Sequence, residues 1–157
     1  MKKIFGILAL ATIALSAVSC DDKMDGAKGE ATIGFESDNI EVKMAEFIHV
    51  PIQVTSKTKV WPVAAKVEVT SDLYTADQDF LLTDDMVYVA EPEHTNEAGE
   101  YTDKAGNVIT PSGRLEIRIP DYKKLKEMNF TITIVDHNQA NVAIGTTQVK
   151  AAKKSKK

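Results

Sequence analysis

The sequence predicts an all-β protein, built as one antiparallel β-sandwich of about seven or eight strands with a hairpin excursion. Apolar and polar residues alternate with period two in run after run, which is the pattern of strands with one buried face. Turn-forming residues separate these runs, which together fill about 120 residues. Only 121–128, which follows Pro120 and begins with the potential cap Asp121, looks helical, and it is too short to be more than a connector.

The strongest alternation predicts strands in five runs, at 32–36, 47–54, 63–70, 115–119 and 130–134. Shorter candidates lie at 40–42, 87–89 and 142–144. Pro51 falls inside the second run. Because proline has no N–H to donate to a ladder, we expect its strand to lie at a sheet edge there or to be bulged.

The stretch 91–111 has the least regular pattern. The turn signal Asp103-Lys104-Ala105-Gly106-Asn107, flanked by Tyr101 and by Val108, predicts a β-hairpin that projects from the sandwich. His94 lies there among glutamates and raises the alternative of a divalent metal site, but the spacing matches no ligand pattern and a solvated acidic loop is the simpler interpretation. No internal repeat is evident in the sequence.

The first 19 residues have the three parts of a secretory signal peptide. Lys2 and Lys3 precede an apolar run from Ile4 to Val18, and small residues lead to Cys20. A transmembrane helix is the alternative, but it needs about 20 apolar residues, and Asp21-Asp22 ends the run too soon.

The segment Ala17-Val18-Ser19-Cys20 resembles the lipobox of bacterial lipoproteins, although Ala17 stands where leucine is usual. The resemblance implies lipid attachment, including palmitate, at Cys20, and the acidic pair after it is similar to the surface-export mark of Bacteroidetes lipoproteins. We therefore expect an outer-membrane lipoprotein that faces the cell surface. Cys20 is the only cysteine, so no disulfide can form within the chain.

Signal removal would leave a flexible tether at 20–30, one domain at 31–150 and a basic tail at 151–157. The mature chain carries 17 basic and 23 acidic residues, a net charge of −6, and suggests no basic face for nucleic acid. The lysine-rich end could touch anionic headgroups, although a solvated tail is the simpler interpretation.

The order of features over 31–150 resembles the Calx-beta domain, an immunoglobulin-like β-sandwich. An aromatic-bearing strand with Phe35 is followed by Glu46 and the run 48–54. The run 63–70 then leads into Thr75-Ala76-Asp77-Gln78-Asp79-Phe80, with Phe80 in place of the family's tyrosine. The excursion at 91–111 is not part of the family pattern.

The same resemblance implies calcium as a possible cofactor, with Glu46, Asp79 and Asp121 at the positions of family ligands. Calcium takes six to eight oxygen ligands, largely from carboxylates. The chain departs from the family by having Tyr122-Lys123-Lys124 where further acids are usual, and lysines after the last strand. The alternative is that Asp79 and Asp121 make turn and cap hydrogen bonds.

Exposed aromatic residues raise the alternative of glycan binding. Trp61 lies between two strong strand runs, and Tyr101 lies in the excursion, so these two are the candidate ligand-binding residues. Aromatic residues make up only 6% of the chain, which is low for a sugar-binding face. A core-capping role for Trp61, with its indole N–H bonded to a nearby acceptor, is the competing interpretation.

No catalytic arrangement is suggested by the residue pattern: no Ser-His-Asp or Cys-His set and no phosphate loop. We therefore expect a non-enzymatic structural or protein-interaction module, anchored in a membrane by its N-terminal lipid, with another envelope protein as the partner. A glycan-binding lipoprotein of a polysaccharide-capture system is the alternative.

Overall fold

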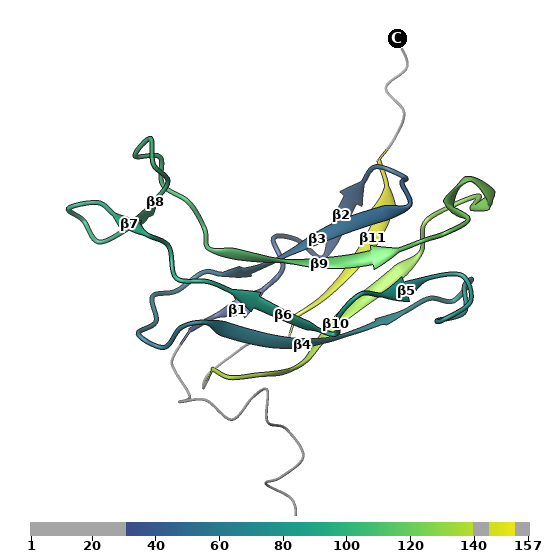
Figure 1. Cartoon of the computed structure of the whole chain (residues 1–157), viewed down its shortest axis with the longest axis horizontal. Coiled ribbons are helices and arrows are strands. Elements are labelled where there is room, and N and C mark those ends of the chain that lie inside the picture. The colour runs from purple at the N-terminus through teal and green to yellow at the C-terminus, as the bar shows by residue number, and fades with distance from the viewer. Residues whose placement is uncertain (1–30, 140–144, 153–157) are drawn as a thin grey trace, which may run out of the picture.

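The computed structural model describes residues 31–139 and 145–152, which form two sheets packed face to face (Figure 1). The first sheet has the order β1 (Ile33–Gly34), β3 (Phe47–Val54), β9 (Ser112–Arg118), β5 (Leu81–Leu82). The second has the order β2 (Asn39–Val42), β11 (Thr146–Ala151), β10 (Phe130–His137), β4 (Val63–Thr70), β6 (Met86–Val89). The predicted all-β sandwich is confirmed.

The long strands bury every second side chain between the sheets. In β3 the four inward residues Ile48, Val50, Ile52 and Val54 are at most 2% exposed. Phe80 and Phe130 meet edge to face in the same core, with ring centroids 5.1 Å apart. The alternation in the sequence thus marked the core correctly, because burial of one strand face is what produces it.

Pro51 has the position expected for a proline in a strand. It pairs with Arg114 of β9 on one side, whereas on the other side β1 reaches only Gln53 and Val54. β3 is therefore a sheet edge at Pro51, so the missing N–H interrupts no ladder in the described structure.

The last strand, β11, was not predicted. The candidate at 142–144 lies outside the described residues, and the strand that the structure has is 146–151, which runs parallel to β2 and antiparallel to β10. Together with β2, β11 forms the one parallel pair among the described strand pairs of an otherwise antiparallel sandwich. Its inward positions hold Thr147, Val149 and Ala151, which give too weak an apolar alternation to recognise.

β6 and β9 belong to different sheets but approach closely at Gly113. A Cβ at this position would lie 2.5 Å from the carbonyl oxygen of Tyr88 and 2.6 Å from a methyl group of Val87. Both distances are far below van der Waals contact, so only glycine allows the two sheets to meet here.

The expected connector is a single turn of 3-10 helix, η1 (Tyr122–Lys124). Asp121 occupies the N-cap position, but its side chain makes no cap hydrogen bond and forms an ion pair with Lys124 instead, at 2.9 Å. The predicted capping role of Asp121 is therefore wrong. Within the described ranges no helix is long and apolar enough to cross a membrane.

Candidate functional site

The excursion at 91–111 projects from one end of the sandwich as a small sheet of its own (Figure 1). β7 (His94–Thr95) pairs with β8 (Tyr101–Thr102), and the chain then returns along β8, with the Ile109 N–H donating to the Tyr101 carbonyl oxygen at 2.9 Å. The hairpin excursion is confirmed, and it contains two successive turns rather than the one that the sequence predicted.

The two turns are built alike. In the first, the Asn96 side-chain oxygen accepts the Glu100 N–H at 2.9 Å, and Gly99 has a φ of +77°. In the second, the Asp103 carboxylate accepts the Asn107 N–H at 2.9 Å, and Gly106 has a φ of +86°. In each turn an Asn or Asp side chain closes the loop, and a glycine supplies the left-handed residue.

The two turns also share a short sequence pattern. Asn96–Thr102 reads NEAGEYT and Asp103–Ile109 reads DKAGNVI, with Ala-Gly at the same two places. The shared Asx-x-Ala-Gly pattern was the available signal for two equivalent turns.

The second turn is held by a charge. Hydrogen bonds lower the pKa of Asp103 below its usual range, first from the side chain and backbone of Asn107 and then from the Ala105 and Gly106 amides. The carboxylate is thus ionised when it closes the turn, and hydrogen bonds to a charged acceptor are stronger than those between neutral groups. The excursion is a defined surface rather than an irregular loop.

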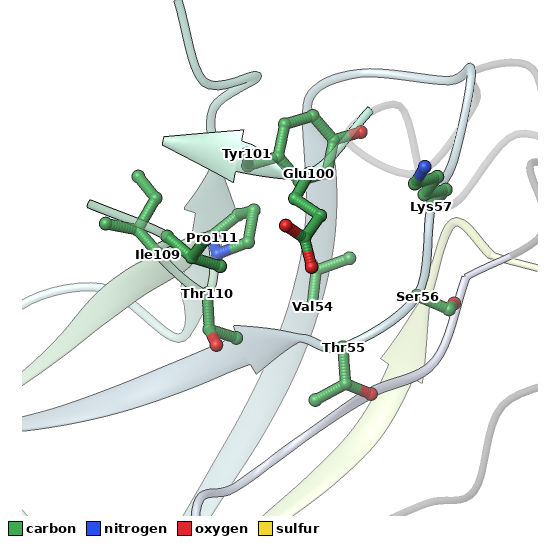
Figure 2. A pocket seen from close by; sticks show the side chains of 10 residues that line it. Val54, Thr55, Ser56, Lys57, Glu100, Tyr101, Ile109, Thr110 and Pro111 are labelled. Atoms are coloured by element: carbon green, nitrogen blue, oxygen red, sulfur yellow. The ribbon is translucent and has the colours of Figure 1, made fainter. Parts of the chain in front are cut away.

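A groove of about 240 Å³ lies between this excursion and the end of β3 (Figure 2). Its walls come from three separated segments, the end of β3 with the following loop, the start of β8, and the return into β9. The lining residues are Val54, Thr55, Ser56, Lys57, Glu100, Tyr101, Val108, Ile109, Thr110 and Pro111.

The walls of the groove are fixed to the sandwich by backbone hydrogen bonds. The Val54 N–H donates to the Pro111 carbonyl oxygen at 2.8 Å, and the Thr55 N–H donates to Thr32 at 2.9 Å. Figure 2 shows the Glu100 carboxylate pointing into the middle of the groove, with Ile109 and Pro111 on one side and Lys57 on the other. Val108 is 61% exposed although it is apolar, so it has no role in the core.

The two aromatic residues singled out in the sequence are brought together. The rings of Trp61 and Tyr101 meet edge to face with centroids 5.8 Å apart, but only Tyr101 lines the groove. Trp61 packs against the core, and its indole N–H donates to the Thr58 carbonyl oxygen at 3.1 Å. The core-capping interpretation of Trp61 is therefore the one that the structure supports, with the half-buried Tyr101 as its partner at the groove.

Buried polar side chains hold the loop that carries Trp61. The Thr58 hydroxyl donates to the Gln139 side chain at 3.3 Å, and both residues are buried. The Asn138 side chain donates to the Pro62 carbonyl oxygen and accepts the Ala64 N–H, each at 2.9 Å. These hydrogen bonds hold the loop of Trp61, which packs against Tyr101, and none of the bonded residues lines the groove.

Glu46, Asp79 and Asp121 lie near one end of the sandwich, but each carboxylate has another partner. Glu46 pairs with Arg118 at 3.0 Å, Asp79 accepts the Thr75 N–H at 2.8 Å, and Asp121 pairs with Lys124. In the described part of the chain no three His, Cys, Asp or Glu side chains group as metal ligands. The structure does not assemble the implied calcium site, and the turn role of Asp79 is confirmed.

The loop metal site considered for the excursion is not assembled either. His94 approaches Glu93 only at 4.0 Å, and both side chains are largely exposed. The described excursion therefore presents its glutamates to solvent, as a solvated acidic loop would.

The lipid attachment residue, Cys20, lies outside the described residues. The chain matches no protein-family model, no curated protein and no solved structure.

Proposed function

We propose that the chain is a lipid-anchored lipoprotein of a bacterial outer membrane, exposed at the cell surface, which acts as a non-enzymatic interaction module and binds another envelope protein in the excursion groove. The observation that carries the proposal is an excursion, closed by its own hydrogen bonds, that holds exposed apolar side chains over a groove. The N-terminal sequence features support the location, and the groove supports the mode of action.

Rigidity supports binding, because a surface that is already ordered loses little entropy when a partner docks. The two Asx-closed turns and the bond from Ile109 to Tyr101 keep the excursion in one conformation. Val108 and Ile109 are apolar but 61% and 38% exposed, and neither belongs to the core. Exposed apolar groups at the rim of a groove are typical of protein-binding sites.

We also propose that the domain is Calx-beta-like. In support, Asp79 closes the 75–80 turn that carried the resemblance, with Ala76 bridging to Phe80. The two-sheet architecture is compatible with this family, although it is shared by many unrelated β-sandwiches. The groove belongs to the excursion, which lies outside the family pattern, so its function is argued from the site alone.

Site-specific photo-crosslinking tests the binding surface in the cells that make the protein. A photoreactive amino acid at position 108 should give one discrete protein adduct, identified by mass spectrometry. The same amino acid at position 135 is the control, because Val135 is also an exposed valine, at 38%, but lies on β10. Equal adducts at both positions, or none at 108, would contradict a protein-binding groove.

Glycan binding is the second candidate, and the composition of the groove favours it. Tyr101 supplies an aromatic ring, while Thr55, Ser56 and Thr110 supply hydroxyl groups around it. The test is retention of the full-length chain on polysaccharide gels. Tyr101→Ala should abolish retention, whereas Tyr88→Ala, which removes an exposed tyrosine on β6, should not. Retention that survives Tyr101→Ala would remove the glycan candidate from this groove.

A further inference from the structure

We infer that the partner of the groove is a protein segment that presents one large apolar side chain flanked by lysine or arginine. The inference rests on the proposed function of the groove and adds the chemistry of its occupant. Three features carry it, namely the charge of the excursion, the lack of ion pairs from its glutamates to lysine or arginine among the described residues, and the size and lining of the groove.

The excursion concentrates negative charge. Residues 91–111 contain five acids, Glu91, Glu93, Glu97, Glu100 and Asp103, against one lysine, a net charge of −4. The mature chain as a whole carries −6, so most of its excess charge lies in this one projection. All four glutamates are exposed. A negative surface of this kind attracts and orients a basic partner and repels an acidic one.

In the part of the chain that the structure describes, the glutamates of the excursion form no ion pair with a lysine or arginine. Among the described residues Glu91, Glu97 and Glu100 take part in no ion pair, and Glu93 approaches only the His94 ring. Glu100 accepts a hydrogen bond from the Asn96 amide at 2.9 Å, which orients its carboxylate without cancelling the charge. A cation on a partner can therefore bind Glu100 without first breaking an internal ion pair.

The groove itself accepts one apolar side chain. Its volume of about 240 Å³ is below the range of roughly 300–1,000 Å³ typical of pockets for drug-sized ligands. Val54, Tyr101, Val108, Ile109 and Pro111 supply its apolar lining. An apolar anchor side chain held in a small groove, with charged groups that set its orientation, is a common arrangement of protein interfaces.

Lys57 and Glu100 have opposite charges in the groove, so they should affect the binding of a basic partner in opposite directions. The Lys57 amine lies against Gly99, 2.8 Å from where a Cβ on that glycine would be, and the Lys57 side chain lines the same groove as Glu100. Lys57 is the one cation in the lining and repels a basic partner. Removing Lys57 should tighten binding, whereas removing the charge of Glu100 should weaken it. An anionic ligand would show the opposite signs.

Selection from a random-peptide library on the full-length chain in non-ionic detergent tests the inference. The library is first depleted on the double variant Val108→Ser/Ile109→Ser, which leaves the core residues untouched. We expect the enriched peptides to contain a large apolar residue with Lys or Arg close by. Enrichment of acidic or uncharged peptides, or no enrichment that depends on Val108 and Ile109, would overturn the inference.

Fluorescence anisotropy with one enriched peptide then tests the charges. Glu100→Gln should weaken binding about tenfold at low salt, Lys57→Ala should strengthen it, and both effects should shrink at high salt. Glu68→Gln on β4 is the matched control, because Glu68 is exposed on the other sheet. Tighter binding by Glu100→Gln, or equal effects of Glu100→Gln and Glu68→Gln, would overturn the inference.

The crosslinking experiment distinguishes a failure of the inferred basic partner from a failure of the proposed protein-binding function. An adduct at position 108 with a partner whose contact segment is acidic would leave the interaction module standing and remove the basic partner. The loss of both the adduct and the peptides would remove both proposals.

Discussion

At the scale of single residues, His49 and Glu116 show how two outward-facing side chains on neighbouring strands become a pair. They are opposite each other on β3 and β9, and the His49 ring nitrogen lies 2.8 Å from the Glu116 carboxylate. This hydrogen bond, followed by that of the Thr83 hydroxyl at 2.9 Å, lowers the pKa of Glu116 below its usual range. The ionised form of Glu116 is thus favoured in the folded protein.

The lowered pKa of Glu116 makes the free energy of unfolding depend on pH. Because the folded-state pKa is depressed, the contribution of Glu116 is fully present above the unfolded-state pKa and is lost as the pH falls through the folded-state pKa. We expect Glu116→Gln to lower the urea midpoint near neutral pH, and the difference from the wild type to close as the pH is lowered below about 5. Thr83→Ala, which removes one donor, should act in the same direction with a smaller amplitude. A difference that stays constant across this window would contradict the assignment.

Sequence reasoning at this scale recognised residue types better than their partners. Trp61 and Tyr101 were identified separately, since exposed or loop aromatics stand out in a chain with few of them, but no spacing indicates that their rings touch. Glu46, Asp79 and Asp121 were singled out because the resemblance implied that they stand at the positions of family ligands. Their partners Arg118, the Thr75 amide and Lys124 could not be read from the pattern, because they depend on side-chain rotamers and on local turn geometry.

At the scale of elements, the contact between β6 and β9 depends on Gly113. We expect Gly113→Ala to destabilise the protein by about 1–3 kcal/mol, because the new methyl group meets the Tyr88 carbonyl and forces the two strands apart. Urea denaturation measures the change. Gly34→Ala on β1 is the control, since nothing lies within 4 Å of a Cβ there. Equal stability of the two variants would contradict this prediction, because it would mean that β6 and β9 can move apart at little cost in free energy.

The strands that the sequence predicted are those with strong side-chain alternation, and the elements it missed lack that alternation. β3, β4, β9 and β10 bury large branched residues at every second position, which is visible in one dimension. β5 has only two residues, and β11 pairs through its backbone while its inward side chains are small or polar except for Val149. Such strands form because neighbours offer free hydrogen-bonding edges, which is a property of the assembled sheet.

The two turns of the excursion provide a second prediction at this scale. Asn96→Ala and Asp103→Ala each remove the side chain that closes one turn, so we expect faster hydrogen exchange at the Glu100 or Asn107 amide, respectively. Global stability should change by no more than about 0.5–1 kcal/mol, because the core lies outside the excursion. Exchange that remains slow in both variants would mean that the β7–β8 pairing alone orders the projection.

At the scale of the whole molecule, the chain enters the sandwich at the end that carries the groove. The Thr32 N–H donates to the Ser56 hydroxyl at 2.6 Å, and Ser56 lines the groove. If Cys20 bears the lipid, only residues 21–31 separate it from Thr32, and eleven residues span at most about 40 Å. The proposed binding surface would then lie within that distance of the membrane, within reach of the envelope protein that we propose as its partner.

The anchor is the premise of this geometry and can be tested directly. Because Cys20 is the only cysteine, metabolic labelling with an alkyne fatty acid should label the wild-type chain through this one thiol, and Cys20→Ser should abolish the label. Ser19→Ala keeps a small residue before the cysteine and should retain it. Each buried methylene adds about 0.8 kcal/mol to membrane affinity, so the labelled chain should remain with membranes after a high-salt wash that removes proteins held by charge alone. A label that persists in Cys20→Ser would place the acyl chain elsewhere and separate the groove from the membrane.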